Sequence, residues 1–523
     1  MEQRRLLLAI VISMVLVIGY QELVLSRYKR AHPVATSPAQ PAPSEPAAPP
    51  AGDLAASLDG DTVVVDTDTL RVGITPTGAR LVHLELKAYR RTVSPDSPPL
   101  DLVQEGPVLP VTLQLDGAHS DAALAYRADR STLDLHGAEQ GEVVFVASSP
   151  DGGRVEKRYR FSGDGYLFGL TASLSGTSQP KTVGLIMTPL AAETPTAAAT
   201  QVGAALDNRR LVEKPLKTVQ KAPIPVPAAS WAGFAERYFV SVAMPPSGTV
   251  PAVMTTAAES VPIVRLDAPA PDGGAQFDIY TGPKDREILA RAGHDLDRAV
   301  DFGWFWFVAI PLLHMLRWLY RITGNYGVAI IVVTAIAKLV AAPLTQTTFR
   351  NMREMQKIQP QMAKLRERYK DDQAALQKEM MELYRRHRVN PFSGCVPMLL
   401  QLPIFVGLYN TLSRAIELRH APFALWINDL SAPDRLVVPG IPAAAPLVGT
   451  GVPVLTLLMG ASMFLQQWLT PQQGDPSQQR MMMFMPLIFT FMFINFPSGL
   501  VLYWLVNNLL TIGQQYLMMR SAK

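Results

Sequence analysis

A single positive charge, Lys338, stands in an otherwise apolar stretch between Gly327 and Leu344. A cation inside a membrane span is costly, so it normally faces protein or water and marks a functional path. Thr334 lies four residues earlier, on the same face of a helix. This pattern predicts an electrostatic site within a membrane. The alternative is that Lys338, near the end of its span, extends its ammonium group to the lipid headgroups.

Two further apolar segments carry polar residues. Gln401 lies centrally in the segment 392–412. Near the C-terminus, polar or amphipathic side chains recur at helical spacings of four, three and four, at Trp504, Asn508, Thr511 and Gln515. Together with Lys338 these residues predict a water-filled groove between helices. The alternative is that they hydrogen-bond one helix to the next.

Six apolar segments of the 523-residue chain predict membrane spans. We expect a signal anchor at 1–25 and five further spans at 325–344, 392–412, 451–469, 481–496 and 500–518. The alternative for the first segment is a signal peptide that is cleaved. The loop 345–391 has eleven Lys or Arg against six Asp or Glu, whereas the loop 413–450 is balanced. By the positive-inside rule, both termini are predicted to be cytoplasmic and the region between the first two spans periplasmic.

That region has two parts. Residues 26–57 are mostly Pro, Ala and Ser, which predicts an extended linker. Residues 58–297 contain short segments of alternating polarity separated by Gly, Asp, Ser and Pro, for example 62–65, 70–74, 81–86, 143–147 and 166–174. This alternation predicts a large, mainly antiparallel all-β domain, and we expect it to be a sandwich.

The segment 301–322 differs from the predicted spans. His314, Arg317 and Arg321 recur at spacings of three and four on one face, and Pro311 interrupts the apolar run. We predict an amphipathic helix in the plane of the membrane surface. The alternative, a spanning helix, would put the β domain on the other side of the membrane.

The charged loop 345–391 predicts two amphipathic helices around a break at 369–372, forming an antiparallel hairpin. Its methionines predict a soft apolar surface that contacts varied partners, namely Met352, Met355, Met362, Met380 and Met381. The alternative is that these methionines pack the hairpin on itself. The basic surplus also suits lipid headgroups or ribosomal RNA.

Composition and missing motifs argue against an ATPase, a zinc hydrolase and a serine hydrolase. The single cysteine, Cys395, excludes an intrachain disulfide, and the eight histidines have no metal-ligand spacing. The chain has no Walker A, HExxH, GxSxG or CxxC motif. We therefore expect no cofactor, no metal, no DNA partner and no enzymatic reaction.

Three long blocks, NPFSGCVPMLLQLPIFVGLYN, APFALWINDLSAPD and MMMFMPLIFTFMFINFPSGLVLYWLVNN, closely resemble the YidC-type membrane protein insertases of Gram-negative bacteria. The resemblance is specific from about Asp301 to Gln515. Before Asp297 it rests on domain size, position and β pattern. It implies a periplasmic β-supersandwich and a five-helix core that encloses a hydrophilic groove.

The resemblance also implies a function. A cation at the position of Lys338 attracts the acidic, translocated part of a nascent membrane protein, whose apolar helix leaves along the third and last spans past Tyr503 and Trp504. Folding and assembly of inner-membrane proteins, and contacts with the Sec translocon and ribosomes, are implied by the family alone. This chain departs from the common pattern in having Lys338 instead of Arg and Trp504 instead of Tyr. Lysine keeps the charge but loses the planar bidentate fork.

Two other functions fit parts of the sequence. A lone cation in the membrane also suits a small-solute or proton-coupled transporter, although we find no inverted repeat. The β domain alone would suit a membrane-tethered periplasmic protein that binds or processes sugars.

Overall fold

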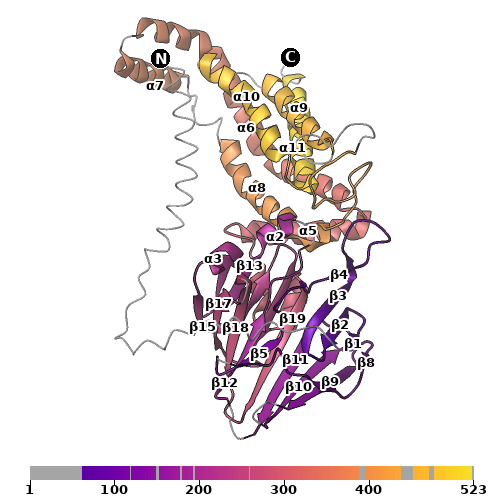
Figure 1. Cartoon of the computed structure of the whole chain (residues 1–523). Helices are drawn as coiled ribbons and strands as arrows, with labels where there is room; N and C mark the ends of the chain where they lie inside the picture. Colours follow the sequence, from indigo (N-terminus) through magenta and orange to yellow (C-terminus); the bar gives the residue numbers. More distant parts are fainter. Residues whose placement is uncertain are drawn as a thin grey trace. The chain divides into compact units, whose positions relative to one another are not determined.

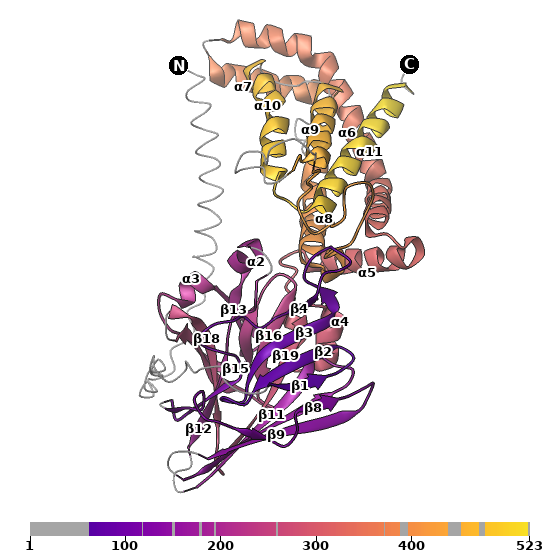
Figure 2. The ribbon, with the colours of Figure 1, turned by 45° about the vertical axis from the view of Figure 1, so that its right-hand side comes forward.

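A computed structural model describes most of the chain after residue 61, namely residues 62–117, 119–148, 152–176, 180–192, 195–257, 260–370, 372–387, 396–437, 451–469 and 476–520. The predicted anchor at 1–25 and linker at 26–57 lie outside these residues. Strands occupy the first half of the described chain and helices the second (Figures 1 and 2).

A five-stranded sheet has the order β4-β3-β2-β1-β8. Its pairs are antiparallel except for β1 with β8, which is parallel. Buried and half-exposed residues alternate along β1, as expected for a strand with one face on a core. The strands are β1 (Val63–Asp66), β2 (Leu70–Thr75), β3 (Arg80–Arg90), β4 (Pro99–Asp101) and β8 (Thr132–Asp134).

A second sheet of 14 strands follows the order β6-β5-β12-β18-β17-β15-β16-β19-β11-β10-β9-β7, with β13 paired to β14 and β15. Its pairs are antiparallel. The strands are β5 (Thr112–Leu115), β6 (His119–Ser120), β7 (Arg127–Ala128), β9 (Gln140–Ser148), β10 (Arg154–Ser162), β11 (Leu167–Ser175), β12 (Thr182–Met187), β13 (Val202–Asp207), β14 (Arg210–Pro215), β15 (Ile224–Ala235), β16 (Phe239–Met244), β17 (Val250–Thr256), β18 (Pro262–Pro269) and β19 (Gly274–Pro283).

One hydrophobic core joins the two sheets. Val65 and Leu84 of the smaller sheet belong to the same buried cluster as Phe145 and Leu185 of the larger one. The predicted β-rich, mainly antiparallel domain is therefore confirmed. The description all-β was too strict, because short helices cover parts of the sheets, namely α2 (Pro195–Thr200), α3 (Leu216–Val219), α4 (Arg286–Ala292) and η2 (Leu296–Ala299).

A buried ion pair lies within this domain. Lys157 on β10 and Asp121 are both fully buried, and the Lys157 ammonium lies 2.6 Å from Asp121 Oδ2. The ammonium also donates to the carbonyl oxygens of Gly78 at 2.7 Å and Val111 at 3.0 Å. Burial lowers the pKa of Lys157, and the Asp121 charge opposes that shift. The pair thus fastens two loops to the larger sheet.

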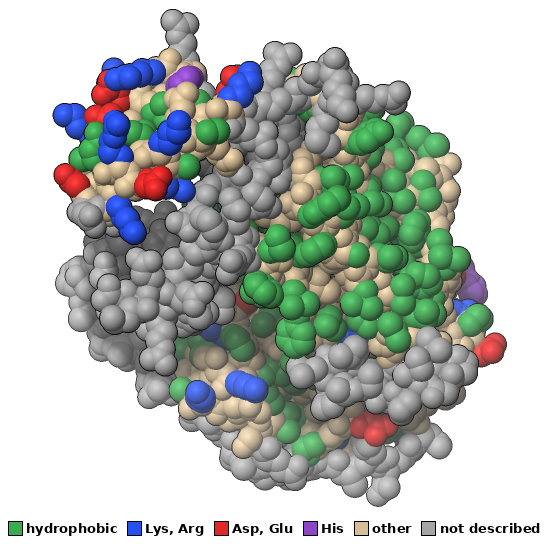
Figure 3. Space-filling model, turned by 90° about the horizontal axis from the view of Figure 1, so that it is seen from above, with side chains coloured by type: hydrophobic (Ala, Val, Ile, Leu, Met, Phe, Trp, Pro, Cys, Tyr) green, Lys and Arg blue, Asp and Glu red, His purple; other side chains and the backbone are tan. Residues whose placement is uncertain are grey.

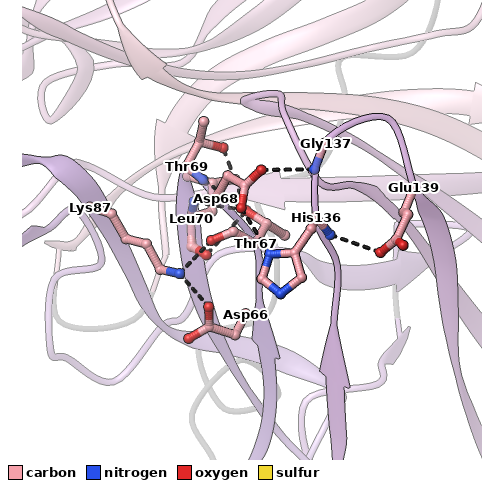
Figure 4. A network of polar contacts seen from close by, with 9 residues as sticks. All are labelled: Asp66, Thr67, Asp68, Thr69, Leu70, Lys87, His136, Gly137 and Glu139. Carbon is pink, nitrogen blue, oxygen red and sulfur yellow. Dashed lines mark hydrogen bonds and ion pairs between the residues drawn. The ribbon is translucent and has the colours of Figure 1, made fainter.

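An exposed polar network connects the β1–β2 turn to the β8–β9 turn (Figure 4). The Asp68 carboxylate lies 2.9 Å from His136 Nδ1 and accepts a hydrogen bond from the Gly137 amide at 2.8 Å. Glu139 accepts a bond from the His136 amide at 3.0 Å. The hydrogen bond and charge of Asp68 raise the pKa of His136. The network therefore contains a titratable contact between a turn of the smaller sheet and the connection that leads from it to the larger sheet.

Helices make up the rest of the described chain. They are α5 (Trp306–Thr323), α6 (Tyr326–Arg368), α7 (Gln373–Arg386), α8 (Val396–Arg414), η4 (Ile416–Leu418), α9 (Val454–Leu469), α10 (Pro476–Phe493) and α11 (Ser498–Arg520). Pro311 lies inside α5, which continues through it as one helix. Residues 326–368 form one helix, which continues from the apolar segment into the charged one through Pro343 and Pro360.

Among the described residues, one helical stretch, Tyr326–Pro343, is both long and apolar enough to cross a membrane. Two shorter apolar helices, Val454–Leu469 and Met482–Phe493, accompany it. Large apolar side chains are exposed along α9, α10 and α11, including Trp468, Phe484, Leu487, Phe491 and Leu517. Hydrophobic side chains gather in a broad area of the surface in Figure 3. Such a surface suits contact with lipid.

Candidate functional site

Lys338 contacts the last helix of the chain. Its ammonium group donates a hydrogen bond to Thr511 Oγ1 on α11 at 2.8 Å. Thr511 in turn donates to the Asn507 carbonyl oxygen one helical turn earlier at 2.6 Å. The structure therefore brings together two residues that the sequence placed on different spans. Lys338 is only partly buried.

Thr334 lies on the same face of α6 as Lys338, but its hydroxyl group is used within its own helix. Thr334 is 1% exposed and donates to the Ile330 carbonyl oxygen at 2.7 Å. This i to i−4 bond satisfies the hydroxyl proton without a second helix. The role of Thr334 as a groove residue that contacts a substrate stays a prediction.

The polar stripe of α11 divides between two neighbouring helices. Whereas Thr511 meets α6, Asn508 donates to Ser462 Oγ on α9 at 3.0 Å, and Gln515 donates to the Leu469 carbonyl oxygen at 2.8 Å. Asn508 and Gln515 are almost fully buried. Both side chains bond helix to helix, in line with the alternative reading of the stripe. Their role as groove residues stays a prediction.

Ser462 is a polar residue of this site that the sequence reasoning missed. It lies in the apolar helix α9, where its Oγ also donates to the Met459 carbonyl oxygen at 2.6 Å. Its signal in the sequence was a small polar residue two positions after Gly460. A Cβ atom at Gly460 would lie 2.0 Å from Thr490 Oγ1 on α10. Small residues of α9 therefore permit close contact with both α10 and α11.

Trp504 belongs to an aromatic cluster formed by three helices. Its ring centroid lies 4.8 Å from that of Phe405 on α8 and 5.1 Å from that of Phe493 on α10. The neighbouring Tyr503 is 3% exposed. The cluster gives this end of the helical region a rigid aromatic wall. The side chain of Gln401, a predicted groove residue on α8, lies outside the described residues.

The loop between α8 and α9 fixes the start of α9. Asp434 Oδ2 accepts hydrogen bonds from the Leu455 amide at 2.5 Å and the Thr456 amide at 3.3 Å. Asp434 Oδ1 accepts from the Trp426 indole N–H at 2.6 Å. A carboxylate that satisfies free amides at a helix N-terminus stabilises that helix. The capping role of Asp434, within the block APFALWINDLSAPD, was also missed from the sequence.

Arg317 on α5 joins three carboxylates. It donates to Asp285 Oδ2 at 2.8 Å and also bonds Glu287 and Glu417. Asp285 and Glu287 begin α4 at the end of the β domain, whereas Glu417 lies in η4 beyond α8. One residue of the predicted polar face of α5, Arg317, therefore forms ion pairs with carboxylates of neighbouring elements of the protein. His314 and Arg321, the other two residues of that face, are exposed.

The hairpin of α6 and α7 has a methionine core. Met355, Ile358 and Met362 are buried together and pack against Met380, Leu383 and Tyr384. Met381 is 49% exposed. The described side chains thus favour the alternative in which most of the methionines pack the hairpin on itself. The side chain of Met352 lies outside the described residues.

The described residues contain no group of three or more His, Cys, Asp or Glu that could hold a metal ion. The helical region contains a cation bonded to a neutral hydroxyl and polar groups buried between apolar helices, and a β domain precedes it. These features define the class of protein. It is an integral membrane protein with a polar interior and a large domain outside the membrane.

The comparisons with known proteins identify the family. Residues 62–315 match the model of the YidC periplasmic domain, and residues 318–523 match that of the 60Kd inner membrane protein. The membrane protein insertase YidC of Syntrophobacter fumaroxidans is 40% identical over 486 residues, covering 88% of this chain and 86% of that protein. That of Geobacter sulfurreducens is 38% identical over 540 residues, covering 99% and 98%. The chain belongs to the YidC family of membrane protein insertases.

A solved structure described as an active YidC insertase with the first transmembrane domain resolved is also similar. It shares 19% identity, covers 89% of this chain and 94% of that chain, and has a TM-score of 0.38. The family consists of inner-membrane proteins with a periplasmic domain, here the β domain. Insertases are a non-catalytic class of protein, and the transporter alternative finds no support among these relatives.

Proposed function

We propose that this insertase receives nascent membrane proteins in a polar groove between α6, α8 and α11 and attracts their acidic translocated segments with Lys338. One observation carries the proposal: the Lys338 ammonium bonds a neutral hydroxyl and has no ion-pair partner among the described residues. An unneutralised cation near apolar helices offsets part of the desolvation of a passing carboxylate. The reaction needs no cofactor, because no covalent bond changes.

The proposed topology has six spans, with the anchor 1–25 and the five segments 325–344, 392–412, 451–469, 481–496 and 500–518. Both termini are cytoplasmic, and the β domain, 58–297, is periplasmic after the linker 26–57. The segment 301–322 lies in the membrane surface. Exposed Trp304, Trp306 and Phe307, beside buried Leu313 and Leu316, support that placement. The hairpin 345–391 is cytoplasmic.

The partners in this proposal are nascent integral membrane proteins and lipid. Contacts with the Sec translocon, its accessory subunits and ribosomes belong to the proposal at the level of the family. Chaperoning of folding and assembly follows if the exposed apolar surface of α9 to α11 holds a newly inserted helix before it joins its partners.

Insertion into proteoliposomes tests the proposed role of Lys338. Two single-spanning substrates should differ only in whether their translocated segment carries Asp or Asn residues. We expect Lys338→Ala to lower insertion of the acidic substrate by about fivefold, or about 1 kcal/mol for one ion pair in contact with water, and to leave the neutral one nearly unchanged. Lys338→Arg should retain the acid preference. Equal loss for both substrates would refute the electrostatic role.

A further inference from the structure

The Lys338–Thr511 contact has a defined direction. A threonine hydroxyl has one proton to donate and two lone pairs to accept. The Thr511 proton points to the Asn507 carbonyl oxygen at 2.6 Å, so its oxygen is left as an acceptor for the Lys338 ammonium at 2.8 Å. Thr511 therefore fixes the ammonium group by accepting, without adding a charge.

The ammonium keeps donors for a second ligand. A lysine ammonium has three N–H groups, and Thr511 uses one of them. Some other cations of the described helices are paired with carboxylates, for example Arg317 with Asp285 and Lys357 with Glu354. No such partner lies beside Lys338 among the described residues. Its positive charge is thus held in place but not neutralised.

The position of Thr511 is itself fixed by its helix. One turn on either side of it, Asn508 bonds Ser462 on α9 and Gln515 bonds the Leu469 carbonyl oxygen of the same helix. These two bonds fix the rotation of α11 about its own axis and its position along α9. A functional group is held precisely when its supporting residues are locked in this way. Thr511 then presents its oxygen to α6 from a rigid surface.

We propose that Thr511 is a positioning residue that orients the Lys338 ammonium toward an entering carboxylate, and that its neutrality preserves the preference for acidic substrates. This inference rests on the proposed function of Lys338 and adds a residue that sets its specificity. A flexible lysine without this acceptor samples many rotamers, and its charge is spread over a larger volume. A carboxylate in place of Thr511 would satisfy the lysine within the protein.

The substrate pair with Asp or Asn residues in the translocated segment tests this inference in proteoliposomes. Thr511→Val keeps the shape of the side chain but removes the acceptor, and we expect it to lower the ratio of acidic to neutral insertion by about threefold to fivefold, roughly one net hydrogen bond. Thr511→Ser keeps the hydroxyl and should restore the ratio. Thr511→Asp should lower the ratio at least as far as Thr511→Val.

A matched control removes a hydroxyl group elsewhere in the helical region. Thr490 on α10 also donates to a carbonyl oxygen of its own helix, that of Pro486 at 2.7 Å, whereas the Lys338 ammonium donates to Thr511. Thr490→Val should leave the ratio unchanged. If Thr511 had a purely structural role, Thr511→Val would lower insertion of both substrates equally. A lowered ratio of acidic to neutral insertion therefore excludes that role.

The outcomes separate the two proposals. An unchanged ratio in Thr511→Val, together with a lowered ratio in Lys338→Ala, overturns the positioning role alone. An unchanged ratio in Lys338→Ala overturns the proposed function of the cation, whatever Thr511→Val does. A ratio that is raised in Thr511→Asp would also contradict the role of a neutral acceptor.

Discussion

Removing the Arg317 side chain should loosen the junction between the β domain and the helices. Arg317 is 16% exposed, and its partners Asp285 and Glu417 are 14% and 16% exposed. Arg317→Met keeps much of the apolar stem and removes the charge. The change leaves two nearly buried carboxylates close together without a cation, which is costly because each keeps its desolvation penalty.

The expected size follows from the three contacts. Glu287 is 53% exposed, so its ion pair contributes between zero and about 1 kcal/mol. Loss of one partner of a buried pair costs about 3–5 kcal/mol. Asp285 keeps its two capping bonds from the Glu287 and Ile288 amides, which reduces the loss. We expect about 2–3 kcal/mol, a factor of roughly 30 to 150 in local opening.

Native-state hydrogen exchange of the full-length protein in lipid nanodiscs measures this opening. In Arg317→Met, the Leu289 amide of α4 and the Arg419 amide after η4 should exchange faster by about 30-fold or more, while the amides of β10 keep their wild-type rates. Arg286→Met is a matched control, because Arg286 is 42% exposed and lies 3.9 Å from Asp297. The reasoning fails if exchange at α4 is unchanged in Arg317→Met or rises equally in the control.

Two further predictions concern the β domain of the full-length protein, measured by amide exchange. Lys157→Met should destabilise β10 by about 3–5 kcal/mol because it removes the ammonium group that pairs with the buried Asp121 carboxylate, and adding Asp121→Asn should recover a large part of that loss; a double variant less stable than the single one would contradict this. The raised pKa of His136 means that its contact with Asp68 stabilises the fold at pH values below the ordinary histidine pKa and loses that contribution as pH rises through the raised value. The Gly137 amide, after correction for intrinsic rates, should therefore lose protection as the pH rises above the ordinary histidine pKa of about 6.5 in the wild type but not in His136→Gln; identical profiles would refute it.

Local pattern predicted the strands, but not their order in the sheets. The segments 62–65, 70–74 and 143–147 became β1, β2 and β9, because alternation of polarity requires only one buried face. Neighbours in the larger sheet are often distant in sequence, such as β11 with β19 and β5 with β12. Such pairings depend on the side chains of both strands and on the loops between them, so a single sequence does not determine them.

The polar residues of the helices were identifiable by type, whereas their partners were not. Spacing placed Thr511 and Gln515 on one stripe, yet one meets α6 and the other meets α9. A stripe spans a wide angle of the helix surface, so it can face two neighbours at once. The rotation of α11 decides which residue faces which helix, and packing of small residues such as Ser462 sets that rotation.

Because α6 is unbroken, Lys338 and the first half of the hairpin lie on one continuous helix. Its 43 residues span about 64 Å at the helical rise, and Lys338 lies about 30 Å from Ile358 in the hairpin core. A force that tilts the hairpin is therefore delivered along a single rod to the place where Lys338 meets Thr511. A partner that docks on the hairpin can thus move the Lys338 charge without contacting Lys338 itself.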